Sequence, residues 1–128
     1  MPEYFLRVVA VAEHARLICD SGALEEGGKG VRFKVHTSEG AVPAFVVRYD
    51  GKVYGYINRC AHVPVELDWE DGAFFDYSKL YLICATHGAT YLPETGVCVM
   101  GPCKGKRLAS LVVEERDGQI FLKETPHV

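Results

Sequence analysis

The sequence of 128 residues lacks several features that would assign it to a specialised class of protein. No apolar run approaches the roughly 20 residues of a transmembrane helix, so we expect no membrane span. The first residues contain no basic segment followed by an apolar stretch, and we expect no secretory signal. Internal repeats and low-complexity tracts are also missing. The formal net charge is −3 and the pI is about 5.9, which argues against nucleic acid as a partner.

The five cysteines are an odd number, and no export signal accompanies them. This combination predicts a cytoplasmic protein, because cysteines in a reducing compartment bind metals or are buried more often than they form disulfides. The glycine-rich stretch 27–30 has no Ser or Thr after its lysine. We therefore interpret it as a plain turn and not as a phosphate-binding loop.

Short apolar or alternating segments, separated by turn residues, run along most of the chain. Asp50-Gly51 and Asp117-Gly118 predict hairpin turns between neighbouring strands. One helical turn is expected over 21–26, with Ser21 as its N-cap. The pattern predicts an all-β sandwich or barrel. The segments that we predict to be strands are residues 4–9, 31–35, 44–49, 53–57, 79–84, 108–113 and 119–122.

Two short boxes of cysteine and histidine each follow a predicted strand. The first box holds Cys60 and His62, and the second holds Cys84 and His87. A thiolate and an imidazole two or three positions apart on a tight loop can point at one metal centre. Two arrangements are then open. All four side chains can bind one zinc ion as a tetrahedral Cys₂His₂ site. Alternatively, the two cysteines bind one iron and the two histidines the other iron of a [2Fe-2S] cluster.

The residues around the boxes favour the iron–sulfur cluster. The second box continues with Gly88, an aromatic residue at Tyr91, Thr95-Gly96 and Gly101-Pro102. This array, over about residues 58–104, resembles the Rieske iron–sulfur family, which has Cys-x-His, a spacer, Cys-x-x-His-Gly and a Gly-Pro loop over the cluster. The resemblance implies one [2Fe-2S] cluster per chain.

The resemblance assigns roles to individual residues. Cys60 and Cys84 are expected to hold a buried iron, while His62 and His87 hold the iron nearer the surface, which is the expected exit for electrons. Tyr91 matches the tyrosine that bonds a ligand thiolate. Gly101 and Pro102 match the loop that closes over the cluster. No residue is expected to be catalytic, because the cluster only carries one electron.

Two departures separate the chain from the cytochrome bc members of the family. Those proteins have a disulfide between the boxes, and the corresponding positions here are Val65 and Thr86. They also have a serine that bonds a bridging sulfide, where this chain has Ala89. With fewer hydrogen bonds to its sulfur atoms, the cluster stabilises an added electron less well, and acidic surroundings repel that electron. We therefore predict a potential in the lower half of the Rieske range of about −150 to +300 mV.

The resemblance also implies a domain organisation and a function. We expect a single Rieske domain over 1–128, with a base of antiparallel strands (about 1–57 and 105–128) and an inserted cluster-binding subdomain (about 58–104). Within the family it looks like the soluble Rieske-type ferredoxins and small Rieske domains of bacterial dioxygenase systems, which implies electron transfer from a flavin reductase to an oxygenase or similar terminal enzyme. Three alternatives stay open: a small Rieske-like subunit of a reductase such as nitrite reductase, a structural zinc module, and a redox sensor.

The acidic segment and the three remaining cysteines are interpreted separately. From Cys60 to Cys103 the net charge is −5, since six acidic residues are accompanied only by Lys79. This segment is interpreted as an acidic docking face for a redox partner, or as a solvated loop over an aromatic cluster. Cys98 and Cys103 are interpreted as small buried side chains, with a disulfide or redox pair as the alternative. Cys19 is interpreted as structural.

Overall fold

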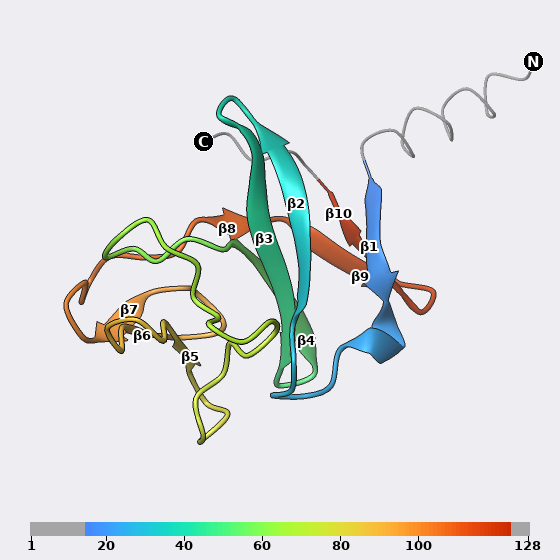
Figure 1. The fold of residues 1–128 in the computed structure, drawn as a ribbon. Helices are drawn as coiled ribbons and strands as arrows, with labels where there is room; N and C mark the ends of the chain where they lie inside the picture. Colours follow the sequence, from blue (N-terminus) through green and yellow to red (C-terminus); the bar gives the residue numbers. More distant parts are fainter. Residues whose placement is uncertain (1–14, 124–128) are drawn as a thin grey trace, which may run out of the picture.

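The computed structural model describes residues 15–123, and nearly all of their regular structure is β-sheet (Figure 1). These residues form three sheets, in which every pairing of named strands is antiparallel. The prediction of an all-β fold is therefore confirmed. The strand predicted over 4–9 lies outside the described residues. No helix within 15–123 is long and apolar enough to cross a membrane.

Two of the sheets form the larger end of the molecule, which we call the base. Their strand orders are β2-β3-β4-β8 and β1-β10-β9. Apolar side chains from both sheets pack together, and Val46 and Ile120 are fully buried between them. The strands of the base are β1 (Arg16–Asp20), β2 (Val31–Thr37), β3 (Gly40–Tyr49), β4 (Lys52–Ile57), β8 (Ser110–Leu111), β9 (Val113–Arg116) and β10 (Gln119–Leu122).

The predicted hairpins have the expected geometry. Asp50 and Gly51 join β3 to β4, and their φ angles are 52° and 76°. Two consecutive positive φ angles are what a two-residue type I′ turn requires, and its twist matches that of the strands. Asp117 and Gly118 join β9 to β10 in the same way.

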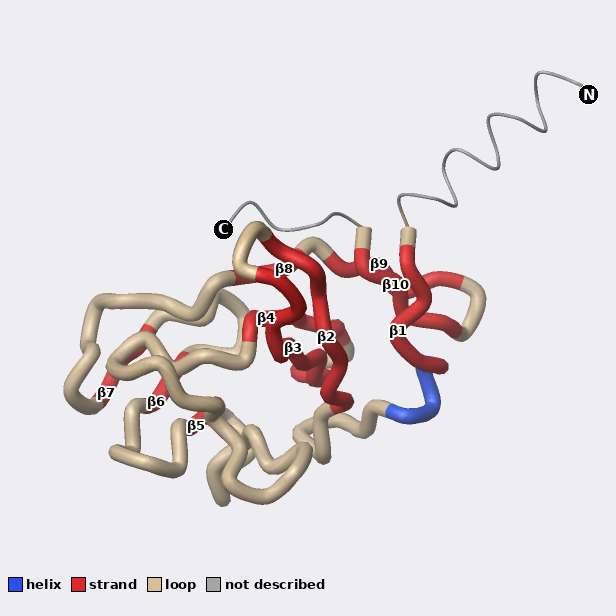
Figure 2. Tube along the Cα trace, turned by 45° about the horizontal axis from the view of Figure 1, so that its top comes forward, coloured by secondary structure: helices blue, strands red, loops and turns tan. Residues whose placement is uncertain are grey.

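The third sheet is small and lies at the other end of the molecule, which we call the tip (residues 58–107). It consists of β5 (Leu82–Ile83), β6 (Thr90–Tyr91) and β7 (Cys98–Met100) in the order β5-β6-β7. Loops make up most of this end (Figure 2). Its core continues into the base, where the ring of Phe74 stacks on that of Phe45 with 3.9 Å between centroids.

Three local predictions are wrong in detail. The helical turn is a 3-10 helix over Ser21–Ala23, and its N-cap is Asp20, without a side-chain cap bond. The strand predicted over 79–84 is shorter because Lys79 is in a turn, with a φ of 63°. The segment 108–113 divides at Val112 into β8, which pairs with β4, and β9, which pairs with β10.

Candidate metal centre

The first of the two cysteine–histidine boxes lies on a tight loop directly after β4. The N–H of Cys60 donates to the carbonyl of Val65 at 2.8 Å, which closes the loop. The side chain of Cys60 is buried, with 4% of its surface exposed, whereas His62 is exposed. The loop therefore points its sulfur inward and its imidazole outward.

The second box follows β5 and is closed by two backbone hydrogen bonds. The N–H of Gly88 donates to the carbonyl of Cys84 at 2.9 Å, and the N–H of Cys84 donates to the carbonyl of Ala89 at 2.8 Å. Cys84 is fully buried and His87 is exposed. This loop thus repeats the arrangement of the first one, with sulfur inside and imidazole outside.

The structure brings all four predicted ligands together at the tip. The Cys60 and Cys84 thiols lie close enough to change each other's pKa, and the ring centroids of His62 and His87 are 5.0 Å apart. Within residues 15–123, no three His, Cys, Asp or Glu side chains surround one ion position. A two-iron cluster does not need such a position, because each iron takes two protein ligands and two sulfides. A buried thiol pair beside an exposed imidazole pair therefore fits the donor set of a Rieske cluster.

Tyr91, on β6, lies beneath the first box. Its hydroxyl is 3.2 Å from the Cys60 sulfur and accepts the N–H of Ala61 at 3.0 Å. Burial by itself raises the pKa of the Cys60 thiol, but hydrogen bonds from Tyr91 and from the N–H groups of His62 and Val63 outweigh it and lower that pKa. Burial raises the pKa of Cys84. The surroundings of Cys60 therefore favour the thiolate, which is the form that binds a metal.

The Gly-Pro loop packs directly against the second box. Gly101 has a φ of 99°, and a Cβ added there would lie 2.9 Å from the Cα of Ala89. No side chain fits at that separation, so glycine is required for the close approach. Pro102, the next residue, is exposed. The loop matched to the family's cluster-covering segment thus lies beside the predicted ligands.

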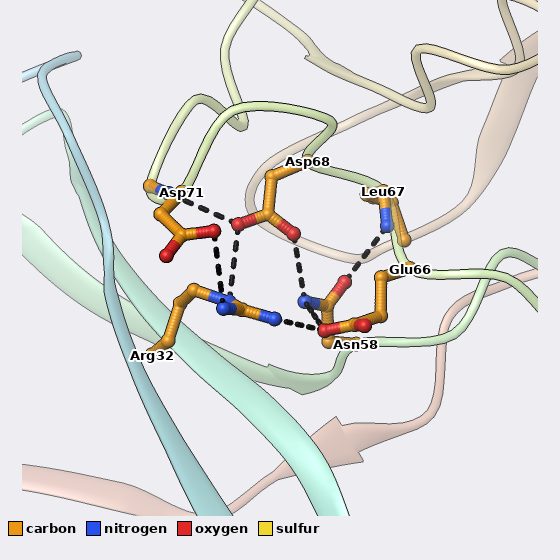
Figure 3. Close-up of polar contacts among 7 residues, drawn as sticks. Arg32, Asn58, Glu66, Leu67, Asp68 and Asp71 are labelled. Carbon is orange, nitrogen blue, oxygen red and sulfur yellow. Dashed lines mark hydrogen bonds and ion pairs between the residues drawn. The ribbon is translucent and has the colours of Figure 1, made fainter.

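A polar network that the sequence analysis missed anchors the first box (Figure 3). Asp68 has a fully buried side chain, which accepts hydrogen bonds from the side chain of Asn58 at 2.9 Å and from the N–H of Gly72 at 3.0 Å. Arg32, on β2, forms an ion pair with Asp68 at 3.2 Å. The carbonyl oxygen of the Asn58 side chain accepts the N–H of Leu67 at 2.9 Å. The network ties the loop after Cys60 to the base.

The network also changes the interpretation of the acidic segment. Asp68 adds nothing to a docking face, because it is buried against Arg32. Glu66 and Asp71 also pair with Arg32. The Glu66 side chain is about half exposed, and that of Asp71 is mostly exposed. No local pattern in the sequence distinguishes Asp68 from its neighbours, since its cationic partner comes from a distant strand.

The aromatic residues of that segment have different environments. Phe74 is fully buried, as expected for an aromatic cluster under the loop. Trp69 and Tyr77 are exposed, with relative exposures of 84% and 108%. Cys98 and Cys103 are buried free thiols, as predicted for packed side chains, and Cys19 is a partly exposed free thiol.

Comparisons with known proteins agree with this geometry. The family model of the Rieske [2Fe-2S] domain matches residues 14–122. A fluorene-bound oxygenase variant, in the oxygenase–ferredoxin complex of carbazole 1,9a-dioxygenase, has a similar structure, with a TM-score of 0.71 and 26% sequence identity. That match covers 86% of this chain and 28% of the other. No curated protein is similar enough in sequence to match.

Two further structures share the fold. The terminal oxygenase of carbazole 1,9a-dioxygenase from Novosphingobium sp. KA1 has a TM-score of 0.70 and 24% identity, over 90% of this chain and 31% of that one. A chain in a complex of reduced oxygenase and oxidized ferredoxin of carbazole 1,9a-dioxygenase has a TM-score of 0.68 and 22% identity. The match covers 90% of this chain and 98% of the matched chain. The chain thus spans less than a third of several of the chains that it matches. By its match to the family model over most of its length, the chain belongs to the Rieske [2Fe-2S] domain family.

Proposed function

We propose that the tip holds one [2Fe-2S] cluster and that the protein is a one-electron carrier. Cys60 and Cys84 would bind the inner iron, and His62 and His87 the outer iron. One observation carries this proposal: two loops bring a pair of buried thiols together with a pair of exposed imidazoles. When bound, the cluster supplies reversible uptake of one electron.

The surrounding residues would determine from which side a redox partner can approach the cluster, and they would tune its reduction potential. The two thiols lie in the core and are shielded from water, whereas the two imidazoles reach the surface. A redox partner can therefore approach closely only on the histidine side. Tyr91 donates a hydrogen bond toward the sulfur of Cys60, and such a bond stabilises the added negative charge of the reduced state.

The partners in this proposal are a flavin reductase as electron donor and an oxygenase, or a similar terminal enzyme, as acceptor. Support comes from the similar structure at 26% identity, which is a complex of an oxygenase with a ferredoxin. A cytoplasmic location is part of the same proposal, and the five free thiols of the structure support it. The proposed domain division is a base (about 1–57 and 105–128) and a cluster-binding subdomain (about 58–104).

Metal analysis tests the cluster directly. Protein purified without oxygen is expected to contain about two iron and about two acid-labile sulfide per chain. Electron paramagnetic resonance of the reduced protein should show one unpaired electron with the spectrum of a histidine-ligated cluster. One zinc without sulfide would overturn the proposal in favour of a structural zinc module.

Electron transfer is tested with the loaded protein. A flavin reductase with reduced nicotinamide should reduce the cluster, and the reduced protein should then reduce a Rieske oxygenase in a stopped-flow mixture. Stable co-purification with a large reductase subunit, together with no transfer to the oxygenase, would count against a mobile carrier. It would instead favour a subunit of a larger reductase.

A further inference from the structure

Two cysteines that the proposed cluster does not use lie in contact beside it. The backbone N–H of Cys98, on β7, donates to the carbonyl of Lys106 at 2.7 Å, and the Cys98 carbonyl accepts the N–H of Gly105 at 2.9 Å. These bonds fold the intervening turn back, so that Cys103 packs against Cys98. Their sulfur atoms are 3.1 Å apart, and only 1% and 2% of the two residues is exposed.

We propose that Cys98 and Cys103 are a redox modification site that forms a reversible intramolecular disulfide. A disulfide bond is roughly 2.05 Å long, so the sulfurs need to approach by only about 1 Å. The turn between them includes Gly101, and the residues flanking Cys103 are exposed. A small movement of this turn can therefore supply the approach. Disulfides in reducing compartments are usually of this transient, sensing kind.

The oxidant in this proposal is a low-molecular-weight disulfide of the glutathione type. When the turn moves outward, the Cys103 thiol reaches water and loses its proton, and the thiolate attacks the oxidant, forms a mixed disulfide and releases one glutathione thiol. The sulfur of Cys98 then attacks the Cys103 sulfur and releases the second. Two electrons and two protons pass from the two cysteines to the two glutathione molecules. Lys104 and Lys106 lie on the same exposed turn and attract the anionic oxidant.

Tyr91 connects this pair to the cluster site. Its hydroxyl lies 3.2 Å from the sulfur of Cys60 and 3.3 Å from that of Cys103. A phenol has one hydrogen, and the Cys103 thiol donates its own toward Cys98, so both Cys60 and Cys103 compete for the Tyr91 hydrogen. Oxidation makes Cys103 the poorer acceptor and leaves the hydrogen to Cys60. This step rests on the proposed function, and it predicts a higher cluster potential in the disulfide form.

Cleavage at methionine tests the disulfide without any measurement of activity. The chain has two methionines, and cyanogen bromide cleavage after Met100 places Cys103 alone in the fragment 101–128. Cluster-loaded protein is oxidised with glutathione disulfide, its free thiols are alkylated, and it is cleaved without reductant. The two fragments should remain joined in a mass spectrum and separate with dithiothreitol. Fragments that separate before reduction would overturn the proposal.

Variants identify the partner of Cys103. Cys98→Ser and Cys98→Ala should both give separate fragments, with glutathione attached to 101–128. Cys19→Ser is the matched control and should give joined fragments. Separation in Cys19→Ser, or joining in the Cys98 variants, would overturn the assigned pair. A disulfide between Cys60 and Cys84, formed after cluster loss, lies within one fragment and cannot join the two.

The connection to the cluster is read from the midpoint potential of the same samples. The potential should rise on oxidation of the wild type and stay constant under the same treatment in Cys103→Ser, which has no sulfur to oxidise at this position. Joined fragments without a shift in potential would overturn the role of Tyr91. Iron and sulfide are measured in parallel, because a missing cluster would contradict the proposed function while the fragment result still decides the disulfide.

Discussion

The base and the tip of this molecule are held together in different ways. In the base, β2 pairs with β3 over all seven residues of β2, and β3 continues into β4 through a two-residue hairpin. In the tip, the strands have two or three residues. Side chains provide much of the connection there, as when the Tyr56 hydroxyl donates to the Pro93 carbonyl at 2.6 Å.

This difference shows why the same substitution should have different effects in the two regions. Backbone ladders survive most side-chain changes, because every residue except proline contributes the same N–H and C=O groups. Loops that are held by buried side chains lose their contacts when one of those side chains is replaced. Substitutions in the tip should therefore disturb the cluster site, whereas those in the base should change stability and leave the cluster intact.

The largest expected effect is the loss of the cluster from a tip variant. Cys84→Ser removes a buried thiol that we propose as a ligand of the inner iron, and a serine hydroxyl replaces it poorly. Iron and sulfide should fall from about two each per chain to near zero. Circular dichroism should still show the β-structure of the base. Cys19→Ser, in β1, is the control and should keep its full iron content; retention of iron in Cys84→Ser would refute the ligand assignment.

The next effect concerns the buried network of the tip. Asp68→Ala removes the buried acceptor of the Asn58 amide and one of three carboxylate partners of Arg32, which is partly exposed. Loss of the partner of one buried polar group costs about 1–3 kcal/mol. The free energy of unfolding in urea measures this loss. Asp71→Asn removes a carboxylate that pairs with the same Arg32 but is exposed, so it should change stability little. Equal losses in the two variants would mean that burial does not set the strength of the network.

A smaller effect is expected in the potential of the cluster. Tyr91→Phe removes the hydrogen bond to Cys60, and one such bond stabilises by about 0.5–1.5 kcal/mol. For a one-electron couple this corresponds to a decrease of roughly 20–60 mV. Tyr56→Phe is the control: it removes another buried hydroxyl, from β4 of the base, which bonds to the Pro93 carbonyl, and it should leave the potential unchanged. A potential that does not respond to Tyr91→Phe would exclude this hydrogen bond as a determinant.

The smallest effect is in the base and depends on pH. Arg48, on β3, forms hydrogen bonds with both carboxylate oxygens of Glu115, on β9, at 3.0 and 2.6 Å, and lowers the pKa of that carboxyl to about 2. The stabilisation is complete above the unfolded-state pKa of about 4.3 and is lost as the pH falls toward 2. Glu115→Gln should therefore cost about 0.5–1 kcal/mol at pH 7, after allowance for solvent screening.

The pH profile separates this ion pair from a packing effect. Urea unfolding of wild type and Glu115→Gln at several pH values should give a difference in stability that shrinks from pH 5 to pH 2. The iron content should be the same in both proteins at pH 7. A stability difference that does not change with pH would mean that packing, and not charge, is lost in the variant.

Much of the fold and of the candidate site could be predicted from the sequence because the signals are local. Asp50-Gly51 encodes a hairpin within four residues, and alternation encodes the strands on either side. The candidate ligands Cys60 and His62 are adjacent on one loop, as are Cys84 and His87. The strand predicted over 79–84 is shortened to Leu82–Ile83, because Lys79 takes a turn conformation that its apolar neighbours do not signal.

By itself, the sequence determined the all-β class and the chemical nature of the donor set, two thiols and two imidazoles. Only the tertiary structure decided how the surrounding groups act. A carboxylate such as Asp68 is expected at the surface until a distant strand brings Arg32 to it, and burial is then possible because the charge is paired. In the same way, Cys98 and Cys103 acquire a connection to the site only through Tyr91. Contacts between residues far apart in sequence depend on how the sheets pack, and no short pattern encodes that packing.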